Sequence, residues 1–146
     1  MTIDPAAVDD VSPRETWTRL KADRESILVD VRTRAEWVLV GLPDLAEIGK
    51  QVATIEWQTF PEGRVDPGFA DRLASELEAA GVAKEAELFF VCRSGARSKA
   101  AALAMTEKGF TRCHNVADGF EGPPDGNRQR GRVAGWKASG LPWVQS

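Results

Sequence analysis

An apolar run that ends in a cysteine and continues into an alanine-rich segment is the feature that most constrains the fold of this chain. The run Leu88–Val91 is typical of a buried strand, and Cys92 follows it directly. A helix is predicted over residues 98–108, and Gly109 ends it. A strand, a tight turn and a helix in this order surround the thiol with backbone N–H groups at a helix N-terminus, which favours anions. Arg93 and Arg97, which follow Cys92 closely, favour the thiolate form of its side chain. The stretch therefore predicts a cysteine nucleophile whose reaction passes through an anion.

The rest of the chain alternates strand patterns with helix patterns. Strands are predicted at 27–31, 52–57 and 112–116, and helices after Ser12, after Thr33 and from Asp66 to the stop at Gly81. A long surface loop is expected at 118–135, followed by a short helix at 135–140. Alternation of this kind predicts a three-layer α/β domain, with a mainly parallel central sheet of about five strands flanked by helices. We expect a single domain over residues 1–146, with its ligand beyond the carboxyl ends of the strands.

Composition and charge exclude several functional classes. The net charge of −3 gives no support for nucleic-acid binding, and the longest apolar runs are too short to span a bilayer. The first five residues carry neither a basic nor an apolar signal segment, so we expect a cytoplasmic protein with Cys92 and Cys113 both reduced. His114 is the only histidine and has no carboxylate or cysteine at metal-ligand spacing, so no metal site is predicted.

The loop Cys92-Arg93-Ser94-Gly95-Ala96-Arg97-Ser98 resembles the active-site loop of the rhodanese-like (sulfurtransferase) family. The segment from Val29 to Trp37 resembles the family's first signature, the segment from Asn115 to Phe120 resembles its third, and Gly135–Pro142 resembles its C-terminal tail. The order and spacing of these motifs match the family over nearly the whole chain. Two departures are visible: the stretch Val40–Asp44 lacks the family's histidine, and Asp118 replaces its first glycine.

The resemblance implies a sulfurtransferase that forms a persulfide on Cys92 and needs no other cofactor. The Cys92 thiolate takes sulfur from a donor such as thiosulfate and passes it to cyanide, a thiol or a protein cysteine. The loop residues suit this chemistry, because their amides can stabilise a charged sulfur and Gly95 lets the loop curl. Either Arg93 or Arg97 is expected to bind the dianionic donor.

Two alternatives remain open at this point. One is a sulfur-relay or protein-interaction module with little thiosulfate turnover, although an intact nucleophile favours an enzyme. The other is a phosphatase or arsenate reductase. Related dual-specificity phosphatases place an arginine six residues after the cysteine, where this chain has Ser98, whereas Arg97 comes five residues after it. A loop one residue shorter suits a sulfur atom better than a phosphate.

Two charged residues near the first predicted strand are candidates for a supporting role. Asp30 lies inside an apolar strand and therefore needs a partner. We expect Asp30 and Arg32 to support the structure through an ion pair, with an indirect effect on catalysis. A direct role of Asp30 in orienting the Cys92 loop is the alternative. The arginines at 128, 130 and 132 are interpreted as part of a solvated loop, which alternatively docks an acidic partner or covers the active site.

Overall fold

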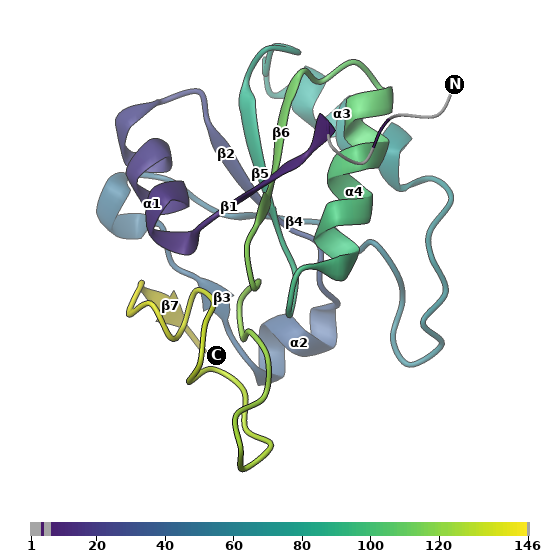
Figure 1. The fold of residues 1–146 in the computed structure, drawn as a ribbon. Coiled ribbons are helices and arrows are strands. Elements are labelled where there is room, and N and C mark those ends of the chain that lie inside the picture. The colour runs from purple at the N-terminus through teal and green to yellow at the C-terminus, as the bar shows by residue number, and fades with distance from the viewer. Residues whose placement is uncertain (1–3, 5–6, 146) are drawn as a thin grey trace.

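Four parallel pairings join five strands into a central sheet in the order β1-β6-β5-β2-β4 (Figure 1). The strands are β1 (Asp9–Val11), β2 (Ile27–Asp30), β4 (Ala53–Thr54), β5 (Glu87–Val91) and β6 (Arg112–Val116). The predicted parallel α/β sheet is thereby confirmed. Because every pairing is parallel, the carboxyl ends of all five strands lie at one edge of the sheet, where ligands bind in such folds.

The computed structural model describes residue 4 and residues 7–145. The prediction that no signal segment is present falls largely on residues 1–3 and 5, which lie outside this part of the chain. Among the described residues, no helix combines the length and the apolar character needed to cross a membrane.

Helices cover both faces of the sheet. The helices are α1 (Pro13–Ala22), α2 (Arg34–Leu39), α3 (Phe69–Ala79) and α4 (Ala96–Glu107), with a 3-10 turn at Ala46–Ile48. Helices α3 and α4 pack Leu73 and Met105 against one face, on which Phe90 lies. The opposite face carries Phe89, which belongs to a second core with Leu20 of α1 and with Trp136. Neighbouring residues of β5 thus enter opposite cores, which explains its continuous apolar run.

Capping residues fix the starts of the first two helices as the sequence predicts. The Ser12 hydroxyl accepts a hydrogen bond from the Glu15 amide at 3.1 Å, and Thr33 and Glu36 form a reciprocal capping box at the start of α2. Helix α3 begins at Phe69, later than predicted, because the Asp66 carboxylate accepts from the Gly68 amide and forms a turn before the helix. Helix α4 begins earlier than predicted, at Ala96.

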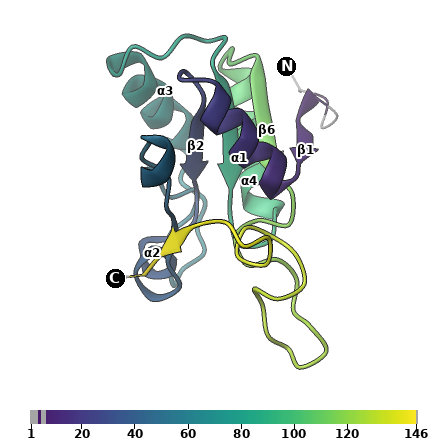
Figure 2. The same ribbon diagram turned by 90° about the vertical axis from the view of Figure 1, so that its left-hand side faces the viewer.

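The C-terminal part of the chain differs from its prediction. Residues 135–140 form a bend and turns, not a helix: the Ser139 amide donates to the Gly135 carbonyl oxygen at 3.0 Å, but this single helical turn ends at Gly140, whose φ is 76°. Strand β7 (Trp143–Val144) pairs antiparallel with β3 (Leu42–Pro43), and the sequence predicted neither strand. Of the predicted strand at 52–57, only Ala53–Thr54 (β4) forms a strand. The loop at 118–135 extends beyond the carboxyl ends of the sheet strands (Figure 2).

Candidate active site

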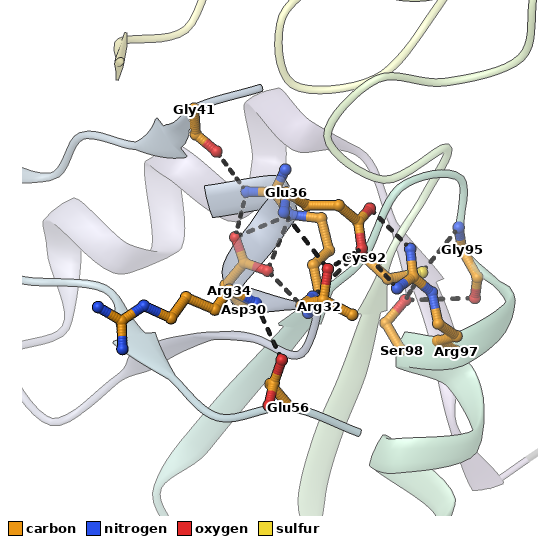
Figure 3. A network of polar contacts seen from close by, with 11 residues as sticks. Asp30, Arg32, Arg34, Glu36, Gly41, Glu56, Cys92, Gly95, Arg97 and Ser98 are labelled. Atoms are coloured by element: carbon orange, nitrogen blue, oxygen red, sulfur yellow. Dashed lines mark hydrogen bonds and ion pairs between the residues drawn. The ribbon is translucent and has the colours of Figure 1, made fainter. Parts of the chain in front are cut away.

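Cys92 lies immediately after β5, at the carboxyl edge of the sheet, and only 1% of its surface is exposed. Two polar groups contact its sulfur: the Gly95 amide, which donates at 3.2 Å, and the Ser98 hydroxyl, whose Oγ lies 3.1 Å from Sγ. Figure 3 shows both groups, together with Arg97, gathered around the thiol. An amide and a hydroxyl in these positions can stabilise negative charge on the sulfur.

The loop that follows Cys92 turns outward before α4 begins. Arg93, Ser94 and Ala96 are exposed, whereas Ser98 is fully buried on the first turn of α4. Gly95 precedes the helix with a φ of 121°, a conformation that residues with a side chain rarely adopt. The loop thus brings the predicted residues together around Cys92, with Gly95 and Ser98 in contact with the sulfur and Arg93 directed away from the core.

Arg97 is engaged by a carboxylate that the sequence did not assign to the site. Its Nη1 and Nη2 donate to Oε1 and Oε2 of Glu36 at 2.8 and 2.9 Å, so that α4 is tied to α2. Burial acts to raise the pKa of Glu36, but the hydrogen bonds and charge of Arg97, together with donors from Thr33, hold that pKa below its ordinary value. The Arg97 charge is therefore already balanced within the protein.

Asp30 and Arg32 form a fully buried ion pair beside the site. Arg32 Nη2 lies 2.6 Å from Asp30 Oδ2 and also donates to the Gly41 carbonyl oxygen at 2.6 Å. The guanidinium stacks over the Phe120 ring, 4.3 Å from its centroid. This pair joins β2 to the segment before β3 and to the loop after β6. No hydrogen bond from Asp30 to the Cys92 loop is present among the described residues, and the geometry agrees with structural support.

The loop after β6 packs directly on the backbone of Cys92. A Cβ on Gly119 would lie 2.5 Å from the carbonyl oxygens of Cys92 and Arg93, so only glycine fits. The Phe120 amide donates to the Cys92 carbonyl oxygen at 2.7 Å. Asp118, which replaces a glycine of the family motif, adopts a left-handed φ of 64° that aspartate tolerates better than most residues. The departure at Asp118 is thus accommodated locally.

A cleft of about 520 Å³ opens beside the Cys92 loop. Its wall contains Arg93, Arg97 and Arg130, so the long loop contributes a third cation to this face. Two strongly exposed apolar side chains also line the cleft: Leu39 is 72% exposed and Phe60 is 68% exposed. No pattern in the sequence indicates that Leu39 and Phe60 line this cleft.

The chain is similar to several known proteins over nearly its whole length. The chain matches the family described as the STR4 middle domain over residues 9–146. The crystal structure of Rv0390 from M. tuberculosis is 40% identical, with a TM-score of 0.85 over 95% of this chain and 98% of that one. Uncharacterized protein RC0915 of Rickettsia conorii is 36% identical over 94% of this chain and 98% of its own length. The chloroplastic rhodanese-like domain-containing protein 4 of Arabidopsis thaliana is 26% identical over 92% of this chain, which spans 25% of that protein.

The chain belongs to the rhodanese-like domain family. A protein of Allochromatium vinosum named sulfurtransferase is also similar, at 24% identity over 94% of this chain and 95% of that protein. Together, the fold and these relatives support a role of the sulfurtransferase type for this rhodanese-like domain.

A hydrogen-bonded chain in this rhodanese-like domain links the thiol to the N-terminal strand. Ser98 Oγ lies 2.5 Å from Asn115 Oδ1, and Asn115 Nδ2 donates to Asp10 Oδ1 at 2.9 Å. Asn115 belongs to the third sequence motif, but no local pattern indicated Asp10. The pairing of β1 with β6 places Asp10 opposite Asn115. Asp10 and Asn115 are therefore additions to the predicted site.

Cys113 and His114 lie apart from the hydrogen-bonded site in this rhodanese-like domain. Burial raises the pKa of the Cys113 thiol to about 11, with the Thr106 hydrogen bond opposing it. His114 bridges two carboxylates, with Nδ1 2.5 Å from Asp9 and Nε2 2.7 Å from Glu87. The sheet supplies these carboxylates from β1 and β5, and they occupy both ring nitrogens.

Proposed function

We propose that the protein is a sulfurtransferase that carries sulfane sulfur as a persulfide on Cys92. Its partners would be a small sulfur donor and a thiophilic acceptor, with no cofactor beyond the covalent intermediate. The observation that carries the proposal is the position of Cys92 Sγ, which follows β5 and has the Gly95 amide and the Ser98 hydroxyl within 3.2 Å. The Gly95 amide supports charge on sulfur, and the Ser98 hydroxyl adds to this when its proton is turned toward Sγ; attack by a thiolate needs no general base.

In the first half-reaction, the Cys92 thiolate attacks the outer sulfur of a donor such as thiosulfate. A bond forms between Sγ and that sulfur while the bond to the sulfonate sulfur breaks. Sulfite leaves with the electron pair of the broken bond and so takes up the charge of the thiolate, while the outer sulfur keeps its own negative charge as the terminal sulfur of the persulfide. The loop amides and the N-terminus of α4 provide a favourable environment for this anion.

In the second half-reaction, the acceptor attacks the terminal sulfur of the persulfide. Cyanide would become thiocyanate, and a thiolate would become a new persulfide. The Cys92 thiolate is the leaving group, so the enzyme returns to its starting state without an external oxidant or reductant. Transfer through a covalent intermediate divides one displacement into two easier ones.

Arg93 is the arginine that the geometry favours for donor binding. Arg97 is held by Glu36 through two hydrogen bonds, so its charge is already compensated. Arg93 is exposed, lines the cleft and has no ion pair within the described residues. Arg130 lines the same cleft, as does Glu121, and donates to the Gly122 carbonyl oxygen at 2.7 Å, which holds its guanidinium in place. A dianionic donor would find two cations here.

A phosphatase is disfavoured by what surrounds the sulfur. The sixth residue after Cys92 is Ser98, whose hydroxyl contacts Sγ, and the arginine before it is bound to Glu36. Arg97 is therefore already paired with a carboxylate of the protein, and the loop has no arginine at its sixth position to bind phosphate oxygens.

The second candidate is a relay that delivers the persulfide to one partner protein and turns over thiosulfate poorly. The exposed Leu39 and Phe60 on the cleft wall favour an apolar contact with such a partner. Under this alternative, the Cys92 chemistry is the same and only the acceptor differs.

A steady-state assay separates these candidates. Purified protein is supplied with thiosulfate and cyanide in one reaction and with an aryl phosphate in another, and Cys92→Ala is the control. The proposal expects thiocyanate from the wild type, none above background from the variant, and no phosphate release. Slow thiocyanate formation by a protein that still takes up sulfur would favour the relay. Cys92-dependent phosphate release without thiocyanate would overturn the proposal.

A further inference from the structure

Three side chains connect Cys92 to the edge strand β1. Ser98 Oγ lies 3.1 Å from Cys92 Sγ and 2.5 Å from Asn115 Oδ1. Asn115 Nδ2 lies 2.9 Å from Asp10 Oδ1. Ser98 is fully buried and Asn115 nearly so, whereas Asp10 is exposed. Asp10 also lines a second cavity of about 440 Å³ on the side of the loop that carries Ser94 and Gly95.

The Asp10 carboxylate decides the orientation of the Asn115 amide. An ionised carboxylate only accepts hydrogen bonds, so the amide must turn its NH₂ group toward Asp10. The amide oxygen, which also only accepts, is then left facing Ser98. A flipped amide would place two acceptors against each other at Asp10.

The Ser98 hydroxyl has a single proton and more than one acceptor within reach. For the 2.5 Å contact with Asn115 Oδ1 to be a hydrogen bond, Ser98 must donate to it. Ser98 Oγ then turns a lone pair toward Cys92 Sγ, where it can accept from a protonated thiol. A thiolate would instead need that same proton, and the Asn115 oxygen would be left without a donor.

We propose that Asp10 holds the resting Cys92 in its protonated form by directing the Ser98 proton away from the sulfur. Asp10 is thus a positioning residue that acts through Asn115 and Ser98 and touches no substrate. The inference rests on the proposed function only in taking Cys92 as the reactive thiol. Its consequence is a nucleophile restrained until the network rearranges, which lowers the exposure of the thiolate to oxidants.

Other charged groups also act on the thiol and must stay constant in a test. Arg97 of α4 interacts electrostatically with Cys92 and is balanced by Glu36 of α2. The Asp30–Arg32 pair lies on β2 and at its end, and the Asp10 side of the loop also carries Lys99 and Asp118. None of these residues is changed by a substitution of Asp10.

The test is a pH titration of the Cys92 thiolate by its ultraviolet absorbance, with the matching Cys92→Ala protein subtracted each time. This readout needs no reagent to reach the buried sulfur, and Cys113 stays silent because burial raises its pKa to about 11. Asp10→Asn frees the Asn115 amide to flip, so the Ser98 proton becomes available to the thiolate. We expect the midpoint to fall by about one pH unit, which corresponds to one hydrogen bond gained by the charged form.

A double-variant cycle distinguishes direction of the proton from simple repulsion by the Asp10 charge. In a Ser98→Ala background, Asp10→Asn should leave the midpoint unchanged. Asp9→Asn removes the same charge from the same strand, but Asp9 contacts His114 instead of Asn115, so it should also leave the midpoint unchanged. An equal shift with and without Ser98, or no downward shift in Asp10→Asn, overturns the proposal. Since the titration requires no sulfur donor, its outcome is separate from that of the sulfur-transfer assays.

Discussion

Glu36 of α2 and Arg97 of α4 form a two-pronged ion pair across the active-site loop, with N–O distances of 2.8 and 2.9 Å. The two residues are 61 positions apart in the chain. Their pairing joins the first family signature to the loop that carries Cys92, and it settles the position of α4 relative to α2 (Figure 3).

Removing the charge of Glu36 should destabilise the fold. Both side chains are about one-fifth exposed, so Glu36→Gln leaves Arg97 poorly paired in a shielded place. We expect a loss of about 1–3 kcal/mol in the free energy of unfolding, measured by denaturant titration. Glu15→Gln is the matched control, because Glu15 pairs with Arg19 at the surface. It should cost less than about 0.5 kcal/mol. Equal losses of unfolding free energy in the two variants would contradict a stabilising role of the Glu36–Arg97 contact.

The same pair predicts an acid-sensitive step in stability. The pKa of Glu36 is lower in the folded state than its ordinary value of 4.5, so ionised Glu36 contributes stability that is fully present above that value. This contribution is lost as the pH falls through the lowered folded-state pKa. The difference in unfolding free energy between wild type and Glu36→Gln should therefore be constant near neutral pH and shrink in acid. A difference that grows on acidification would contradict this reading.

Donor binding should depend on Arg93 more than on other arginines of this face. Arg93→Ala removes an exposed cation from the cleft wall beside Cys92. We expect KM for thiosulfate to rise about tenfold, with a smaller change in kcat, because a charge-assisted contact to the donor is lost. Arg132→Ala is the control, since Arg132 is exposed on the same long loop but is not part of the cleft wall. If both variants have the same KM as wild type, Arg93 does not bind the donor.

Gly119 should tolerate no side chain. In Gly119→Ala, the new Cβ would meet the backbone carbonyl oxygens of Cys92 and Arg93, and the φ of 65° would add strain. We expect a loss of about 2–4 kcal/mol of stability and a displaced active-site loop with little activity. Gly126→Ala offers a control in the same region, because nothing lies within 4 Å of its Cβ position. Thermal unfolding that is unchanged in Gly119→Ala would show that the loop contact is not tight in solution.

The elements that the sequence predicts well are those whose signal is local. The runs Ile27–Val31 and Leu88–Val91 are apolar on both faces, and the Ser12 and Thr33 caps mark helix starts, so β2, β5, α1 and α2 lie close to their expected places. Strands β1, β3 and β7 have two or three residues each and depend on pairing with distant segments, which no local pattern specifies.

The candidate site likewise contains residues that a local pattern predicts and residues that only the tertiary fold brings together. Cys92 and its loop are contiguous in sequence, so their proximity could be predicted from the strand, the turn and the helix start. The partners of that loop could not, because Glu36 reaches Arg97 and Asp10 reaches Asn115 only through the tertiary fold. The predicted helix at 135–140 was wrong because its helical hydrogen bonding stops after one turn, where Gly140 adopts a left-handed φ of 76°.

Intact-mass analysis after treatment with thiosulfate tests the Cys92 persulfide most directly. Wild type and Cys113→Ala should each gain the mass of one sulfur atom, and cyanide should remove it. Cys92→Ala should gain nothing, because the remaining thiol of Cys113 is buried and its pKa is raised to about 11. A wild-type protein that stays unmodified, or a Cys92→Ala protein that still gains sulfur, would contradict sulfur transfer through Cys92.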